Sequence, residues 1–277
     1  MNIINAENLT KSYTERKLLD KASFYLQEGE KVGVIGINGT GKSTLLKIIA
    51  GLEEPDEGQV TCANHIVVRY LPQNPVFDPE MTVLDSVLTQ CVLNFVGSGR
   101  TERTDADAHA QEQKWSLESD AKSMMTRLGI TDFTQKTGEL SGGQRKRLAL
   151  VAALLVPCDV LILDEPTAGL DPKGRDEILD MIADMHARYG NTVILVSHSM
   201  EDVAKYVDRI IVMDHGHVKF DDAPRQVFHH YKELEEIGLA APQVTYLMHE
   251  MKEKGMDVST EATTVDEAKE AILRLIG

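Results

Sequence analysis

The eight-residue stretch GINGTGKS, at positions 36–43, decides the fold. It follows a β-branched run at residues 31–35 that predicts a buried strand, and the apolar spacing of residues 43–50 predicts a helix directly after it. Glycines in such a loop allow backbone N–H groups to face a β-phosphate, and the helix start adds its positive end. Lys42 would reach the β and γ oxygens, and Ser43 would offer its hydroxyl to magnesium. The stretch therefore predicts a phosphate-binding loop, with a chance glycine-rich turn as the alternative.

Two acidic residues end a second apolar run, LILDEPT at residues 161–167. An all-apolar strand of this kind is typical of a sheet covered on both faces, and its end would meet the phosphate loop at the edge of that sheet. Asp164 is expected to hold magnesium through water, and Glu165 to polarise the water that attacks the terminal phosphate. The alternative is an ordinary acidic cap of a turn or helix.

A serine and two glycines open a further amphipathic helix, in the sequence LSGGQ at residues 140–144. Ser141 is a favourable N-cap, and the exposed amides of such a helix start can hold an anion. Ser141 lies 19 residues before Val160, where the acid-ended strand begins. An ordinary serine cap fits the local pattern equally well, so the position relative to the other motifs is what points to phosphate binding.

Taken together, these motifs resemble those of ABC ATPases. In that family the LSGGQ signature binds the γ-phosphate of a nucleotide held by a second ATPase domain, so the resemblance implies a dimer with ATP and Mg²⁺ as cofactors. It also implies that Tyr13 stacks on adenine and that Gln73, in YLPQ, senses magnesium and the attacking water. Asp171, in AGLDP, resembles the loop aspartate that links two active sites, and His198, in ILVSHS, resembles the histidine that contacts the γ-phosphate.

The motifs and the resemblance define three overlapping groups of expected site residues. The catalytic group is Glu165, His198, Gln73 and Lys42. The magnesium group is Ser43, Gln73 and Asp164. The nucleotide-binding group is Tyr13, Gly36, Asn38, Gly39, Thr40, Gly41, Lys42, Ser43, Thr44, Ser141, Gly142, Gly143, Gln144 and Asp171. Donors placed around the γ-phosphate carry most catalysis of this kind, so Lys42 and the signature should matter as much as the base.

The composition is that of a folded globular chain, with 277 residues, 42% apolar and 26% charged. A net charge of −15 repels nucleic acid overall, although a local basic patch can override it. Three cysteines without CxxC spacing argue against a disulfide framework and a zinc site. The longest apolar run, residues 148–156, is far shorter than the roughly 20 residues that span a bilayer, and the N-terminal residues do not resemble a secretory signal. We therefore expect a cytoplasmic protein.

The order of elements predicts an α/β protein: a P-loop NTPase core with an antiparallel β subdomain, a helical subdomain and a small C-terminal helical appendage. The expected nucleotide-binding domain covers residues 1–220, with its helical subdomain at about 82–156 and a polar, mobile insertion at about 95–113. The appendage covers residues 221–277. Its helix signals are Pro224, Pro242, and a capping box of Thr264 with Glu267.

Two branches of the ABC family resemble different halves of the chain. Residues 1–167 resemble the first domain of ABC-F proteins, which act on ribosomes, and residues 168–277 resemble the ATPase subunits of energy-coupling factor transporters. Because there is one ATPase domain and a transporter-type tail, we favour the transporter function. It implies a second ABC ATPase domain, in a homodimer or heterodimer, a membrane transport subunit, and a place at the inner face of the cell membrane. A ribosome or nucleic acid is the less favoured partner, because the basic run at residues 144–147 is typical of a solvated helix face.

Overall fold

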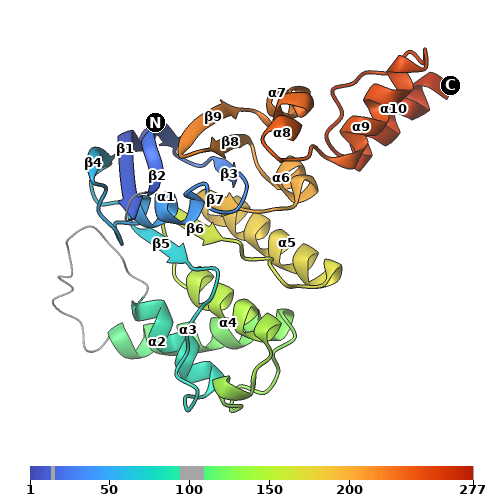
Figure 1. Cartoon of the computed structure of the whole chain (residues 1–277). Coiled ribbons are helices and arrows are strands. Elements are labelled where there is room, and N and C mark those ends of the chain that lie inside the picture. The colour runs from blue at the N-terminus through green and yellow to red at the C-terminus, as the bar shows by residue number, and fades with distance from the viewer. Residues whose placement is uncertain (14–15, 94–108, 277) are drawn as a thin grey trace.

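A six-stranded sheet forms the centre of the computed structural model, which describes residues 1–13, 16–93 and 109–276 (Figure 1). Its order is β5-β6-β7-β3-β8-β9, and the pairings are parallel except that β9 runs antiparallel to β8. In that order the strands are Val68–Leu71, Val160–Asp164, Thr192–Val196, Lys31–Ile35, Arg209–Asp214 and His217–Asp222. The predicted buried strands at 31–35, 160–163 and 192–196 and the hairpin around Gly216 are all present.

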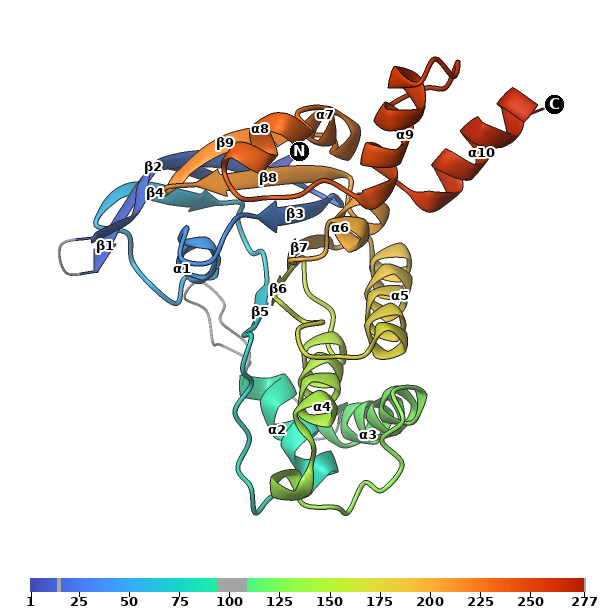
Figure 2. The same ribbon diagram turned by 45° about the vertical axis from the view of Figure 1, so that its right-hand side comes forward.

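A smaller antiparallel sheet lies over one face of the central sheet, with helix α1 between them (Figure 2). Its order is β2-β1-β4, with the strands Arg16–Gln27, Asn2–Tyr13 and Glu57–Cys62. Helix α1 is Lys42–Ile49 and packs Leu45 and Leu46 into this layer. Side chains along a strand alternate between the two faces of the sheet. In β6, Val160 and Ile162 face α1, whereas Leu161 and Leu163 face the opposite side.

Helices cover the opposite face of the central sheet and extend beyond the β5 edge as a helical unit (Figure 1). The helices are α2 (Val83–Leu93), α3 (His109–Arg127), the 3-10 turn η1 (Thr137–Glu139), α4 (Gly142–Leu154), α5 (Pro172–Tyr189) and α6 (Met200–Tyr206). Helix α3 begins at His109, inside the polar insertion expected at 95–113, so the last residues of that insertion are helical. Residues 95–108 of that insertion lie outside the described residues.

Arg69 of β5 joins the helical unit to the sheet, and its side chain is completely buried. The guanidinium donates to the carbonyl oxygens of Ala152 and Ala153 at 3.1 and 3.3 Å, and of Cys91 at 3.0 Å. These carbonyls belong to the last turns of α4 and α2, where helices leave C=O groups without an intrahelical partner. One cation therefore satisfies two helix ends at once.

The C-terminal residues form four helices: α7 (Pro224–His229), α8 (Tyr231–Glu236), α9 (Gln243–Glu253) and α10 (Val265–Ile276). The helix predicted from Pro224 is divided at His230, and the predicted capping box is present because Thr264 and Glu267 bond each other's backbone N–H groups. Phe228 of α7 and Leu234 of α8 belong to the main core, whereas α9 and α10 form a separate cluster. We propose that the independently packed appendage begins near α9 rather than at residue 221.

Candidate nucleotide site

The loop after β3 has the backbone geometry that its glycines predict. Gly41 precedes α1 with φ of +92°, in the left-handed region, and an added Cβ would lie 2.4 Å from the carbonyl oxygen of Leu18. Only glycine fits there without moving the backbone. Lys42, 6% exposed, donates to the carbonyls of Gly36 at 2.7 Å and Ile37 at 3.0 Å. The loop is thus wrapped around its own lysine.

Two carboxylates at the end of β6 influence that lysine. Burial lowers the pKa of Lys42, and the negative charges of Glu165 and Asp164 oppose the shift. Lys42 and Glu165 also line one pocket of about 330 Å³. Its wall consists of Leu18, Asn38, Gly39, Gly41, Lys42, Ser43, Thr44, Gln73 and Glu165. The pocket therefore brings the phosphate loop together with the acidic end of a strand that is not its neighbour in the sheet.

Glu165 is held on both carboxylate oxygens by residues that follow the two strands flanking β6. Gln73 Nε2 donates to Oε2 at 2.7 Å, and His198 Nε2 lies 2.9 Å from Oε1. Gln73 follows β5 and His198 follows β7, so three adjacent strand ends converge on one carboxylate. Glu165 itself has φ of +50°, a left-handed conformation that is costly for a residue with a side chain. The structure thus places the predicted base, glutamine and histidine in direct contact.

Asp164 is 3% exposed, and one of its two carboxylate oxygens has a hydrogen-bond partner among the described residues. Its Oδ2 accepts a hydrogen bond from the Tyr70 hydroxyl at 3.1 Å, whereas its buried Oδ1 has no hydrogen-bond partner within the described part of the chain. Burial, followed by the negative charge of Asp164, raises the pKa of Tyr70 and keeps it a donor. A buried carboxylate oxygen that lacks a partner fits a cation or the water bound to one.

The other predicted binding residues do not line this pocket. Tyr13 ends β1, is 47% exposed, and its hydroxyl donates to Glu53. Ser141 caps α4 in a complete capping box with Gln144, with its Oγ 3.2 Å from the Gln144 N and its own N 2.9 Å from the Gln144 Oε1. Asp171 caps α5 through the Gly174 N at 3.3 Å. Ser141 and Asp171 therefore act as ordinary helix caps within this chain. A helix start that is capped in this way can still bind the nucleotide of a second subunit.

Two residues near the site were missed by the sequence reasoning. Leu18 lines the pocket only because β2 passes beside the loop, and no motif marks it. Tyr70 lies three residues before Gln73 in YLPQ, and strand alternation could have placed it on the α1 face beside the predicted strand of Asp164. The sequence did not reveal that β5 pairs with β6, because the two strands are about 90 residues apart along the chain.

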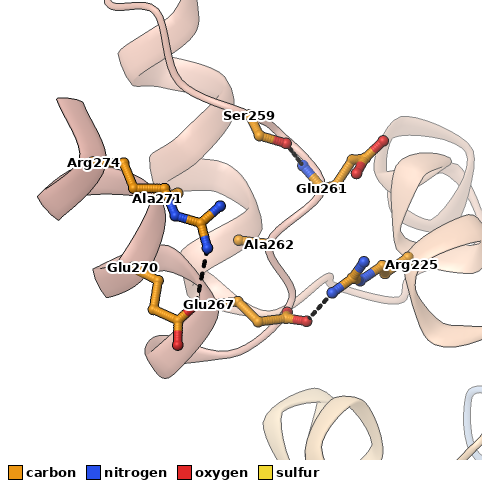
Figure 3. Close-up of a pocket in the computed structure, with 8 residues that line it drawn as sticks. All are labelled: Arg225, Ser259, Glu261, Ala262, Glu267, Glu270, Ala271 and Arg274. Atoms are coloured by element: carbon orange, nitrogen blue, oxygen red, sulfur yellow. Dashed lines mark hydrogen bonds and ion pairs between the residues drawn. The ribbon is translucent and has the colours of Figure 1, made fainter.

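A second depression lies between α7, the loop at residues 259–262 and α10 (Figure 3). Its charged side chains pair with each other: Arg225 donates to Glu267 at 2.5 Å and Arg274 to Glu270 at 3.5 Å. Burial alone would raise the pKa of Glu267, but hydrogen bonds from Arg225 and from two backbone N–H groups outweigh it and lower the pKa to about 2. The Arg225–Glu267 pair joins α7 to α10 and the Arg274–Glu270 pair lies within α10, so we assign this depression no ligand.

The wrapped lysine, the acid-ended strand and the doubly held glutamate define a P-loop nucleoside triphosphatase. Comparison with known proteins narrows that class, because the family model described as "ABC transporter" matches residues 19–168. The chain belongs to the ABC transporter family of ATP-binding proteins, and it is an ATP-binding, ATP-hydrolysing subunit of such a transporter.

Curated relatives resemble the chain over its whole length. The energy-coupling factor transporter ATP-binding protein EcfA2 of Clostridium tetani is 38% identical over 98% of this chain and 96% of its own. The protein of the same name from Clostridioides difficile is 38% identical over 100% and 98%. Such alignments include residues 1–167, so the expected resemblance of that half to ABC-F proteins is not supported, and neither is a ribosome-bound function.

Solved structures agree with this assignment of the fold. A nucleotide-free ATP-binding cassette from an ABC transporter superposes with a TM-score of 0.67 at 26% identity, covering 87% of this chain and 100% of that one. A dimeric cassette in a post-hydrolysis state, bound to ADP and phosphate, gives 0.68 at 24% identity over 80% and 99%. The α/β P-loop fold predicted from the sequence is confirmed. Within the described ranges, none of the helices has both the length and the apolar character needed to cross a membrane.

Proposed function

We propose that this chain powers an energy-coupling factor transporter, and that its site residues have the roles the sequence predicts. The transporter class rests on the full-length similarity to proteins of that name. The catalytic assignment rests on one observation, the contact of Glu165 with both Gln73 and His198 at the wall of the pocket that contains Lys42.

The phosphate loop would bind the triphosphate through its backbone amides and Lys42. The Lys42 ammonium already sits among loop carbonyls, so a small movement of a flexible side chain would direct it toward the β and γ oxygens. Asn38, Thr40 and Thr44 would complete the cradle from the loop and the first turn of α1, whose positive end favours the negative charge.

Magnesium fits the polar groups that remain at this edge. Ser43 would hold it from α1 and Gln73 from β5, with Asp164 acting through water by way of its buried Oδ1. Bound Mg²⁺ supplies positive charge that offsets the charge on the β and γ phosphates. The Tyr70 hydroxyl would keep the Asp164 carboxylate in place.

Glu165 would act as general base on the attacking water. The water oxygen forms a bond to the γ-phosphorus, the bond to the ADP oxygen breaks, and the water proton passes to the Glu165 carboxylate. Gln73, which fixes the direction of the carboxylate before ATP binds, would then contact the attacking water, and His198 would donate to a γ-phosphate oxygen. Both neighbours therefore turn from partners of Glu165 into partners of the reacting groups.

A second ATPase subunit would complete the site. Ser141, Gly142 and Gly143 lie away from the chain's own pocket, at the exposed start of α4, and Asp171 lies at the start of α5. In a face-to-face dimer they would meet the partner's nucleotide, and Tyr13 would stack on the chain's own adenine. Two bound ATP molecules would close the dimer, and hydrolysis would reopen it and move a membrane subunit at the inner face of the membrane.

Two substitutions test the catalytic roles. Glu165→Gln should bind ATP, lower kcat by about 10²–10⁴-fold, and accumulate as an ATP-bound dimer in size-exclusion chromatography. Lys42→Ala should lose tight ATP binding in a titration. Glu250→Gln, an exposed carboxylate of α9, is the control and should behave as the wild type. A Glu165→Gln variant that stays monomeric with ATP and magnesium would contradict the dimer mechanism.

Membrane association tests the transporter assignment. The tagged chain expressed in its own organism should be recovered with a membrane protein after detergent extraction, and the ATPase rate of that complex should exceed that of the chain alone. Recovery without any membrane protein would count against the assignment while leaving the ATPase chemistry intact.

A further inference from the structure

In the basic run at residues 145–147, Arg145 is exposed, whereas Lys146 and Arg147 are half-buried. The run belongs to α4, directly after the LSGGQ signature. Arg145 Nε donates to the carbonyl of Leu140 at 3.1 Å, and Arg147 Nη1 donates to that of Leu128 at 3.3 Å. Arg145 is exposed, as expected of a solvated helix face, and bonds the backbone of the signature, whereas Lys146 and Arg147 are only partly exposed.

Lys146 contacts the turn that carries the proposed base. Its Nζ donates to the carbonyl oxygen of Ala168 at 2.5 Å. The N–H of that same Ala168 donates to the carbonyl of Glu165 at 3.2 Å. A single residue, Ala168, thus links the lysine to the backbone of Glu165.

The turn needs such support because Glu165 has a strained backbone. A φ of +50° in a residue with a side chain persists only where the surroundings fix it. Gln73 and His198 hold the carboxylate, but in the proposed mechanism both exchange Glu165 for substrate groups. During that exchange the hydrogen bonds from Lys146 to Ala168 and from Ala168 to Glu165 would still restrain the turn.

The positive charge of Lys146 also favours a fixed position of Glu165. Its side chain is half-buried, and burial lowers the pKa of Lys146 while the negative charge of Glu165 opposes that shift. The ammonium and the carboxylate are therefore within electrostatic reach of each other.

Neighbouring residues on the same face of α4 touch the same loop. A Cβ added at Gly143 would lie 3.2 Å from Leu170, and Arg147 lies 4.0 Å from the Asp171 carboxylate. Residues three and four apart on a helix share a face, so Gly143, Lys146 and Arg147 form one strip under the loop. The start of α4 and the Glu165 turn are packed as one unit.

We propose that Lys146 is a positioning residue for ATP hydrolysis, which holds the Glu165 turn on the signature helix through the Ala168 carbonyl. This rests on the proposed role of Glu165 as general base. The consequence is that this chain's signature, which serves the partner's nucleotide, and its base, which serves its own, move together.

The test compares Lys146→Met with Lys146→Arg in the full chain. Lys146→Met removes the charge and the donor, and kcat should fall by about tenfold or more, because misplacing a catalytic group by about 1 Å can cost about 10²-fold. The KM for ATP should stay within about threefold, since the phosphate loop is untouched, and Lys146→Arg should restore most of kcat. Lys173→Met, a neighbouring cation with an 84% exposed side chain, is the matched control and should keep the wild-type rate.

Amide hydrogen exchange gives a second measurement, because exchange at Ala168 and Leu170 should accelerate in Lys146→Met. Wild-type kcat in Lys146→Met, equal losses in the Met and Arg variants, or unchanged exchange at these amides would each overturn the inference. Glu165→Gln distinguishes a failure of the proposed general base from a failure of the positioning role of Lys146. If it hydrolyses ATP at the wild-type rate, the proposed base fails; if it is inactive while Lys146→Met is fully active, only the positioning role fails.

Discussion

Gly33 in the middle of β3 allows α6 to approach the sheet more closely than any other residue would. A Cβ at this position would lie 2.8 Å from Val203 Cγ1, and 3.2 and 3.3 Å from the two methyl groups of Val207. Ordinary contact begins at 3.4 Å, so the nearest methyl is about 0.6 Å too close. Valine has one strongly preferred rotamer in a helix, so the side chain cannot turn away and the helix or strand must shift. We expect Gly33→Ala to lower the free energy of unfolding by about 1–3 kcal/mol.

The same shift should reach the active site. Helix α6 begins at Met200, two residues after His198, whose imidazole contacts Glu165. Gly33→Ala should therefore lower kcat several-fold, although residue 33 does not line the nucleotide pocket.

A double-mutant cycle with Val203→Ala tests the steric explanation. Val203→Ala alone removes buried methyl groups and should cost about 2 kcal/mol. In the double variant the new methyl group occupies the vacated space, so the total loss should be smaller than the sum of the single losses by about 1 kcal/mol. Urea unfolding of the four proteins measures this coupling. Losses that add to within about 0.3–0.5 kcal/mol would refute the reasoning.

Two further predictions concern the connections between structural units. Arg69→Met should cost about 3 kcal/mol in urea unfolding, because it leaves three buried carbonyls at two helix ends without their donor; a loss below about 0.5 kcal/mol, as for an ordinary surface substitution, would contradict this. Glu267 has a folded-state pKa of about 2, below its unfolded value of 4.5, so its stabilising contribution is complete above pH 4.5 and disappears as the pH falls toward 2. Protection factors for hydrogen exchange in α10, corrected for the intrinsic rate at each pH, should fall over that range, and Glu267→Gln should show lower protection already at neutral pH.

Most of the fold could be predicted because local patterns and the global fold agree. The all-apolar runs at 160–163 and 192–196 have to be buried on both faces, and the glycines of the phosphate loop allow positive φ angles that other residues rarely adopt. The motif residues Gln73, Glu165 and His198 follow strands, so one sheet edge was enough to bring them together.

What the sequence did not reveal depends on packing between distant segments. The basic run at 145–147 has the composition of a solvated surface, and only the tertiary structure shows Lys146 bonded to a loop carbonyl. The division of the chain at residue 220 followed the end of the last strand, but nothing local marks Phe228 as a residue of the main core. Charge and helix periodicity can be read from one segment of the sequence, whereas burial depends on the distant segments that pack against it.

Because α7 and α8 pack into the main core, they matter to anyone who wishes to express a shortened ATPase. Phe228 is 0% exposed and lies in the same cluster as Val212 of β8 and Val203 of α6. A fragment that stops at residue 220 would present that apolar surface to solvent and would tend to aggregate. A fragment that continues to Ala241, which is also buried in this cluster, would keep Phe228 and Leu234 in place and lose from the cluster the packing of Tyr246 of α9.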